Sequence, residues 1–343
     1  MQTRNLAKKQ FLWLPYTSSI RFKGQTVIFE YNSNVEVIRF SDIHSIMFYG
    51  SVVNLSQEFL EHCIQYNIPI VIHRRNMTKA VFINQSIQTN IKDLLTKQIL
   101  TRENEIKKNY IARQLIKAKL KSSNWLIKTD SGILKKHHNL NQIRSIEAIS
   151  AKHYWEVYFD KLGYPNWTRR GENPVRHILD ATSKFIAGIL LRWISYHNLS
   201  PYHGYMHVQT EYPALIYDLM DPYRGYFEKA IFNSIKKAKA LNRPASEWLP
   251  ISINDLKTCL NSTVYTDATR QIVTMSELMH GIVLALRSYL LNQSYRFIVP
   301  IPGKPNGGRP IKAGYTLYGR RAGRTDFWQK VEEINKESLV LHQ

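Results

Sequence analysis

One stretch of this chain carries side chains able to bind a divalent cation. His203 and His207 frame the sequence His-Gly-Tyr-Met-His, and Asp218 and Asp221 follow in Asp-Leu-Met-Asp-Pro-Tyr-Arg. Residues three apart share one helix face, so the two carboxylates can point the same way. Such an acidic pair is usually a solvated surface, but the apolar neighbours here place the turn against a core, where a carboxylate needs a partner. The stretch therefore predicts a metal site.

A third carboxylate would complete such a site, and the sequence offers two candidates. Glu147 stands at the start of a predicted amphipathic helix lined by Ile146, Ile149, Trp155 and Phe159. Glu156 lies on the same helix, and spacing alone does not choose between them. Carboxylates suit Mg²⁺, whereas an added imidazole suits Mn²⁺ better.

The overall charge points to a polyanionic partner. Lys and Arg number 47 against 26 Asp and Glu, which gives a formal net charge of +21. This excess destabilises a compact fold by self-repulsion, and binding to a phosphate backbone would offset it. An anionic membrane surface would do the same, and a merely basic soluble protein is the plain alternative.

Other classes of protein fit the sequence poorly. Cys63 and Cys259 form no CxxC pair, which argues against a zinc ribbon, an iron–sulfur cluster or a disulfide framework. The basic N-terminus has too short an apolar run for a signal peptide, and no apolar run is long enough to span a membrane. We expect a soluble, cytoplasmic protein with no membrane partner.

The first part of the chain reads as β structure. Residues 20–22 and 27–29 flank a Lys-Gly-Gln turn and predict a hairpin. Ser56 is placed to cap a short helix ending near Ile64, and residues 68–72 and 80–83 resemble strands. These signals predict a small β-rich domain over residues 1–86.

From residue 87 the apolar period becomes helical. One long helix or two are predicted around residues 91–120, and further helices over 175–197, 226–242 and 270–292. Residues 300–343 form a basic segment rich in Pro and Gly that cannot build its own core and is either a solvated tail or an arm along phosphate. The predicted fold class is α+β multidomain, with an all-α catalytic domain over residues 87–299.

A stripe of positive charge on the first helices is a candidate DNA contact. Arg113, Lys117 and Lys121 are spaced four apart opposite the apolar stripe. In isolation such a stripe is an ordinary solvated helix face as often as it is a DNA contact. The excess of basic residues in this chain favours contact with phosphate.

Four stretches together resemble the CRISPR-associated integrase family, the larger of two proteins of spacer acquisition. They are Glu147 to Trp155, Arg169 to Leu179, Leu199 to His207, and Asp218 to Arg224. Each is a weak motif alone, but their order along residues 10–300 is specific. The family's β-then-α order agrees with the predicted domains.

The resemblance implies a metal-dependent DNA endonuclease and integrase that inserts short fragments into a CRISPR array by transesterification. Carried over, the family's metal ligands for Mg²⁺ or Mn²⁺ fall on Glu147, His207 and Asp221, and Asp218 supports the site. Double-stranded DNA, a homodimer and a small second adaptation subunit are the implied partners. Candidate DNA contacts beside the helical stripe are the basic side chains of these motifs: Arg169, Arg170, Arg176 and Arg224.

The sequence also departs from the family pattern. Asn198 stands where Gly is usual, Arg176 where Asn is common, and Asp221 where Glu is commoner. The basic segment after Pro300 has no place in that pattern. Two other functions stay open: a transposon-encoded integrase, and a non-catalytic basic nucleic-acid-binding protein whose acidic cluster is structural.

Overall fold

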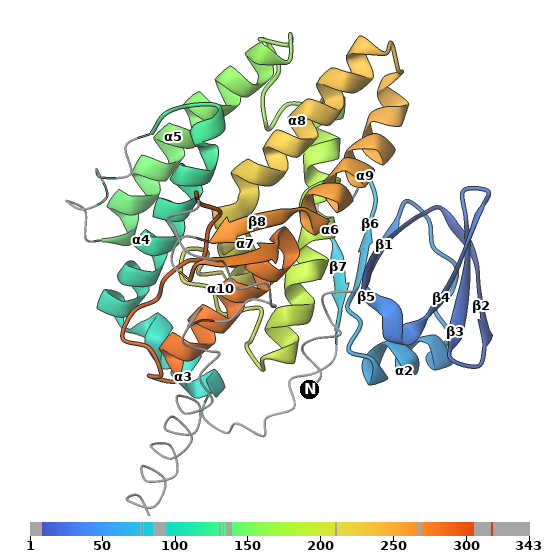
Figure 1. The fold of residues 1–343 in the computed structure, drawn as a ribbon, viewed down its shortest axis with the longest axis horizontal. Coiled ribbons are helices and arrows are strands. Elements are labelled where there is room, and N and C mark those ends of the chain that lie inside the picture. Colours follow the sequence, from blue (N-terminus) through green and yellow to red (C-terminus); the bar gives the residue numbers. More distant parts are fainter. Residues whose placement is uncertain are drawn as a thin grey trace, which may run out of the picture.

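A β-rich N-terminal part lies beside a larger helical part (Figure 1). The computed structural model describes residues 9–304 and Leu317, except residues 76, 78, 85–93, 130, 131, 133, 135–138, 210, 267 and 268. The predicted order of strands first and helices afterwards is confirmed. The predicted boundary between residues 86 and 87 lies outside the described residues, as does most of the segment 300–343.

Two small sheets make up the N-terminal part. β1 (Gln10–Pro15), β5 (Ile43–Tyr49) and β6 (Ile70–His73) run parallel, and β7 (Val81–Ile83) joins β6 antiparallel. β2 (Thr17–Lys23), β3 (Thr26–Tyr31) and β4 (Asn34–Arg39) form an antiparallel meander. The predicted hairpin is confirmed, with Lys23 paired to Thr26 and a φ of 60° at Gly24, which glycine adopts without strain. The predicted cap is also confirmed, because Ser56 accepts from the Phe59 N–H at 3.2 Å at the start of α2 (Gln57–Gln65).

The helical part contains the long elements that carry the predicted site. They are α3 (Leu94–Glu103), α4 (Glu105–Ser122), α5 (Leu140–Lys161), α6 (Pro174–Tyr196), α7 (Ala214–Met220), α8 (Arg224–Ala240), α9 (Trp248–Asn261) and α10 (Met275–Leu290). A single 3-10 turn, η4 (Asp221–Tyr223), joins α7 to α8. α3 and α4 are separate helices because Asn104 interrupts the run and caps α4, accepting from the Lys107 N–H at 3.0 Å.

The prediction that this part is all-α is wrong. β8 (Thr263–Thr266) and β9 (Gln271–Thr274) form an antiparallel hairpin between α9 and α10. The predicted helix over 270–292 therefore begins only at Met275, where Thr274 forms a capping box with Glu277. Ile272 and Val273 alternate in burial as strand residues do, and their apolar side chains had extended the helical pattern too far.

The predicted apolar stripe of α5 is wrong at Ile149, whose side chain is 73% exposed. The buried face of α5 is centred instead on Tyr154, Tyr158 and Phe159. On α4, Ile106 is likewise exposed, because it lies in the first turn, before the helix enters the core at Ile111.

α6 packs the helical part of the molecule against the N-terminal sheet. It packs against β5 and β6, and Gly188 lies so close to them that an added Cβ would meet Val71 at 2.9 Å. Arg192 on the same helix is buried and donates to the backbone carbonyls of Ile43, His44 and Tyr66 at 3.3, 2.7 and 3.0 Å. A buried guanidinium must be hydrogen-bonded, so this contact fixes how the sheet sits on α6.

The basic C-terminal segment begins against the hairpin. The hydroxyl of Tyr223 donates to the carbonyl of Pro300 at 2.7 Å, and Pro302 forms an isolated bridge with Thr266. None of the described helices is both long and apolar enough to cross a membrane.

Two buried histidines, His44 and His280, and the partly buried His197 lie where the sheet, α6 and α10 meet. His44 stacks edge-on against Trp193, and the Nε2 atoms of His197 and His280 lie 2.6 Å apart. Neither ring nitrogen of His44 has a hydrogen-bond partner among the described residues. Burial lowers the pKa of all three histidines, that of His197 to about 3, so the folded chain keeps them neutral.

The chain should therefore lose stability in mild acid. Below pH 6.5 these imidazoles take up protons in the unfolded state but not in the folded state, so stability falls as the pH falls. Each should cost about 2 kcal/mol between pH 6.5 and pH 5. A His44→Leu variant should lose about that much less over this range in urea denaturation. His153→Gln, at a residue whose side chain is 65% exposed, is the control and should behave as the wild type. Equal losses in the wild type and His44→Leu would contradict the prediction.

Candidate active site

Glu147 lies in the second turn of α5 and faces α4. Its Oε1 accepts from the Nζ of Lys119 at 2.6 Å, and it lines a cavity of about 420 Å³. Glu156, the rival candidate, is exposed, and among the described residues its ion-pair partner is His153, at 3.9 Å. The geometry therefore associates Glu147, and not Glu156, with the other acidic candidates.

Asp221 meets Glu147 through the same ammonium group. Lys119 Nζ lies 3.1 Å from Asp221 Oδ2, so one lysine bridges two carboxylates from different elements. The second oxygen, Oδ1, lies 2.6 Å from Arg224 Nε, but the pair is not aligned as a hydrogen bond, and Oδ1 has no hydrogen-bond partner among the described residues. Asp221 is 2% exposed, and these two cations compensate its charge.

The pKa shifts of this cluster follow from burial opposed by opposite charge. Burial alone would raise the pKa of Asp221, but Arg224 and Lys119 outweigh it and lower that pKa below its ordinary value. Burial would likewise lower the pKa of Lys119, yet the two carboxylates raise it. Lys119 is therefore charged and both carboxylates face a cation.

Asp218 serves a different purpose from Asp221. It is fully buried and accepts from the backbone N–H groups of Met206 at 2.9 Å and His207 at 3.1 Å, and also from that of Tyr205. Its Oδ1 also accepts from Nδ1 of the His207 ring at 2.6 Å. Although three residues apart, Asp218 and Asp221 share no hydrogen-bond or ion-pair partner within the described part of the chain. Asp218 holds the histidine loop in place and fixes the orientation of the ring.

His207 therefore presents its other nitrogen. With Nδ1 bound to Asp218, Nε2 has no hydrogen-bond partner among the described residues. Burial would lower the pKa of His207, but the hydrogen bond and charge of Asp218 and the charge of Asp221 raise it. A carboxylate behind one ring nitrogen is the arrangement that orients a metal-binding or proton-transferring histidine.

Glycine and glutamine residues shape the histidine loop. A Cβ on Gly204 would lie 2.8 Å from Asp218 Oδ2 and 2.6 Å from the His207 carbonyl oxygen, so a larger residue does not fit. Buried Gln98 of α3 donates to the carbonyls of Ser200 and His203 at 2.9 and 3.0 Å. The His203 ring bonds to Ser200 Oγ at 2.8 Å and takes no part in the acidic cluster.

Two cavities open on either side of Arg224. The one containing Glu147 is lined by Lys119, Tyr154, Trp155 and several arginines. The other, of about 410 Å³, contains His207 with the aromatic rings of Tyr202, Tyr212 and Tyr217. Arg224 lines both cavities and Asp221 lines neither, so the candidate residues are not enclosed in one pocket.

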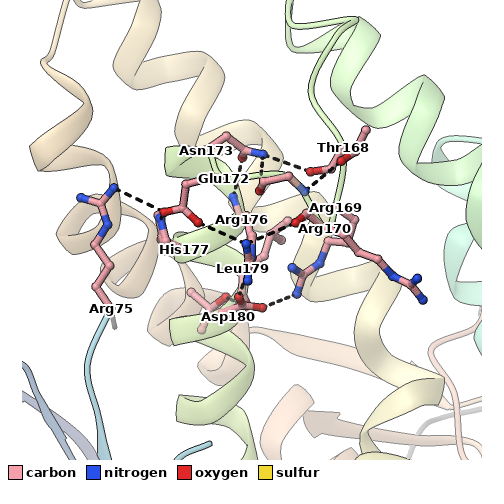
Figure 2. A network of polar contacts seen from close by, with 12 residues as sticks. Arg75, Thr168, Arg169, Arg170, Glu172, Asn173, Arg176, His177, Leu179 and Asp180 are labelled. Carbon is pink, nitrogen blue, oxygen red and sulfur yellow. Dashed lines mark hydrogen bonds and ion pairs between the residues drawn. The ribbon is translucent and has the colours of Figure 1, made fainter. Parts of the chain in front are cut away.

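Two of the arginines predicted to contact DNA, Arg169 and Arg176, are held in a network of ion pairs at the first cavity (Figure 2). Asp180 of α6 contacts Arg169 at 2.6 Å and Arg176 at 3.6 Å. Arg176 also contacts Glu172 at 3.2 Å, and Arg169 lies over the Trp155 ring at 5.5 Å. Arg170 differs from both, because its guanidinium points out of the network and makes no ion pair with any described residue.

The predicted helical stripe lies elsewhere. Lys121 is exposed and Arg113 and Lys117 are partly buried, and none of the three lines either cavity. A role of these residues in DNA binding stays a prediction.

Lys119 is the residue that sequence reasoning missed. It lies three residues after Ile116 and four after Leu115, both buried, so it belongs to the apolar face of α4. A charged residue on an apolar stripe is the signal that would have indicated it. Glu228 was also missed; it lines the Glu147 cavity, and burial raises its pKa.

The predicted ligands are brought near one another without forming a finished three-ligand group. Within the described parts of the chain, no three His, Cys, Asp or Glu side chains lie together closely enough to hold a metal ion. Glu147 and Asp221 share Lys119, whereas His207 interacts with Asp221 only through its charge.

Solved structures share this fold at low sequence identity. A casposase bound to integration product aligns with 96% of this chain and 99% of its own, with a TM-score of 0.73 and 19% identity. A Cas1 protein from Thermotoga maritima covers 85% of this chain and 99% of its own, with a TM-score of 0.69 and 17% identity. A Cas1–DNA complex, matched over 90% of this chain and 100% of its own, has a TM-score of 0.60 and 11% identity. No curated protein matches the sequence.

The sequence itself matches one family profile. The match, to CRISPR associated protein Cas1, spans residues 14–244 of the 343 and so includes Glu147, His207, Asp218 and Asp221. The predicted family is confirmed: the chain belongs to the Cas1 family.

Proposed function

We propose that this chain is a metal-dependent DNA endonuclease and integrase that inserts short DNA fragments into a CRISPR array by transesterification. One observation carries the proposal. Glu147 and Asp221, from separate elements, converge on a single cation, and the charge of Asp221 acts on His207, whose ring is oriented by Asp218.

The residues present fit a divalent cation. Asp221 Oδ1 is a buried carboxylate oxygen without a hydrogen-bond partner among the described residues, and the ammonium of Lys119 shows that the space between the carboxylates accepts positive charge. Two carboxylates and an imidazole nitrogen are donors that suit Mn²⁺ and, less well, Mg²⁺. Glu147, His207 and Asp221 would hold the divalent cation. Bound there, it would stabilise the charge that develops on the attacking and leaving oxygens of a phosphodiester.

The chain's own groups would orient the reacting ends. Asp218 keeps the proton of His207 on Nδ1, which leaves Nε2 for the reaction. Arg224 is held by Asp221 at the boundary of both cavities, where it would contact a phosphate oxygen. The tyrosines around His207 would stack on unpaired bases.

Arginines at the first cavity would bind the DNA backbone. Arg169 and Arg176 are pre-oriented by Asp180, and Arg170 has its guanidinium available for a phosphate. The net charge of +21 favours association with double-stranded DNA along a wider surface.

The partners proposed are DNA, a second copy of this chain and a small second adaptation subunit. Among the proteins of similar fold are a casposase bound to integration product, a Cas1–DNA complex and a Cas6-RT-Cas1–Cas2 complex. The last has a TM-score of 0.67, and its matched chain is covered over 36% of its length. These complexes support DNA and the second adaptation subunit as partners, whereas the second copy of this chain rests on the family resemblance.

A transposon-encoded integrase is the second candidate. A casposase is among the solved structures of similar fold and aligns with 96% of this chain. On this alternative the chain joins its own terminal repeats to a target and needs no CRISPR repeat. A non-catalytic DNA-binding protein is the third reading, and it predicts binding without strand transfer.

Removing the acidic cluster should abolish joining. In an assay with Mn²⁺, a labelled short duplex and a supercoiled plasmid, Glu147→Gln and His207→Ala should each reduce joined product by about 100-fold or more. Glu156→Gln, on the same helix but facing solvent, is the matched control and should retain wild-type joining. Undiminished product from Glu147→Gln would refute the assignment, and no product from the wild type would favour the non-catalytic alternative.

Asp218→Asn should slow joining while DNA binding is kept. An amide in place of the carboxylate would turn an N–H toward Nδ1 of His207 and force the proton onto Nε2. Loss of such a supporting group typically costs 10- to 100-fold, and we expect a drop of about this size in the single-turnover rate. The buried N–H groups that donate to Asp218 will also lose an acceptor, so the melting temperature of the variant is measured in parallel. A wild-type rate at a temperature where the variant is folded would contradict this role.

Arg170→Gln should weaken DNA binding through one lost phosphate contact. The slope of log Kobs against log salt concentration should fall by about 0.9, with no change in sequence preference. Arg39→Gln is the control, because the Arg39 side chain is 68% exposed on β4 and its substitution changes the net charge by the same amount. An equal change in both variants would mean that Arg170 acts only through overall charge.

A further inference from the structure

Lys119 occupies the space between two of the three proposed metal ligands. Its ammonium nitrogen lies 2.6 Å from Glu147 Oε1 and 3.1 Å from Asp221 Oδ2. The side chain is 19% exposed and comes from the apolar face of α4, between buried Ala118 and Leu120. It is thus a built-in partner of both carboxylates and not a surface lysine that happens to reach them.

The packing of the backbone around Lys119 keeps its ammonium group between the two carboxylates. α4 packs against both α5, which carries Glu147, and η4, which carries Asp221. At the end of α4, Gly225 lies against the backbone of Ser122 so closely that any added Cβ would collide with it. Ser122 is one helical turn after Lys119, so this close approach sets the distance from Lys119 to the first turn of α8 and to Asp221.

The four side chains in direct ion-pair contact balance in charge without a metal ion. Glu147 and Asp221 carry two negative charges, and Lys119 and Arg224 carry two positive charges. Asp218 makes no ion pair with Lys119 or Arg224 and accepts instead from three backbone N–H groups and the His207 ring. Glu228 lines the same cavity and acts on Arg224 only from beyond ion-pair distance, and burial raises its pKa.

A divalent cation between the carboxylates would therefore leave the two positive charges of Lys119 and Arg224 without a carboxylate partner of their own in a partly buried site. Unlike exposed charges, these would be poorly screened by solvent. A phosphodiester supplies negative charge and hydrogen-bond acceptors for an ammonium and a guanidinium. Its arrival would let Lys119 exchange a carboxylate for a phosphate oxygen.

We propose that Lys119 holds the place of the divalent cation until DNA arrives, so that the cation and the phosphodiester bind cooperatively. In the DNA-free chain the cation competes with the ammonium for Glu147 and Asp221. In the complex the phosphodiester takes over Lys119, and the carboxylates become free for the cation. No covalent step is involved. The inference rests on the metal site proposed above and adds the order in which it fills.

The experiment measures Mn²⁺ binding to the full chain with and without DNA, by the electron paramagnetic resonance signal of free Mn²⁺. The duplex carries 3′-dideoxy ends, so no joining accompanies binding. The wild type should bind Mn²⁺ about tenfold more tightly with the duplex present, a typical strength for coupled sites, and the duplex should bind more tightly with Mn²⁺ by the same factor. An identical affinity in both conditions would overturn the proposal without any variant.

Lys119→Met tests the residue itself. Without competition from the ammonium, DNA-free Lys119→Met should bind Mn²⁺ about tenfold more tightly than the wild type, and the effect of the duplex should shrink to about twofold. Lys107→Met is the matched control, because Lys107 is exposed on the same helix and its removal changes the net charge equally. Lys119→Arg keeps the charge and should retain the coupling. Circular dichroism verifies that each variant is folded.

The outcomes separate this inference from the proposed function. Unchanged or weaker Mn²⁺ binding by folded, DNA-free Lys119→Met would overturn the competition. No Mn²⁺ uptake by any chain would overturn both the inference and the metal site. If Mn²⁺ and duplex bind cooperatively as expected but the wild type joins no DNA, the inference stands and the integrase function fails.

Discussion

The arrangement of the candidate site depends on one buried contact, the ammonium of Lys119 between Glu147 and Asp221. Two carboxylates repel at short range, and this repulsion is strong in a partly buried setting. α4 supplies the cation, while α5 and η4 each supply one carboxylate, so three elements are held in mutual register by a single group. The close approach of Gly225 to Ser122 supports the same crossing, since it fixes the start of α8 against the end of α4.

Local signals were enough to predict much of the molecule. The β2–β3 hairpin and the Ser56 cap follow from a glycine turn and a hydroxyl before an apolar run, and both are confirmed. Glu147, His207 and Asp221 were predicted from the resemblance of ordered motifs; Glu147 and Asp221 share Lys119, and His207 lines a second cavity. The predictions that were wrong depended on tertiary packing. The apolar residues of the β8–β9 hairpin continue the apolar pattern of α10, so the sequence pattern predicts helix there. Ile149 faces solvent because the buried face of α5 is formed by its tyrosines.

Lys119 shows why the centre of the site was not predictable from spacing. It shares α4 with Lys117 and Lys121, and in the sequence the three look alike. Only the partners differ, and these lie 28 and 102 residues away along the chain. An ion pair between such distant segments has no local signature. The one local trace is its place on the apolar face, where a lysine is costly unless the fold supplies an opposite charge.

The two aspartates illustrate how burial assigns different tasks to similar side chains. Asp218 satisfies three backbone N–H groups and one ring nitrogen, so its oxygens are fully used in holding the loop. Asp221 is equally buried but meets only side-chain cations, and one of its oxygens keeps an unused lone pair. Side-chain cations can move away, whereas backbone groups cannot. Asp221 can therefore exchange partners when a stronger ligand arrives, and Asp218 cannot do so without loss of the loop.

The arginines of the first cavity belong to the exchangeable kind, because Asp180 holds Arg169 and Arg176 through a side-chain carboxylate that a phosphate can replace. The site thus combines a fixed part, built on backbone hydrogen bonds, with an exchangeable part built on ion pairs, and it is the second part that a polyanion and its cation would reorganise.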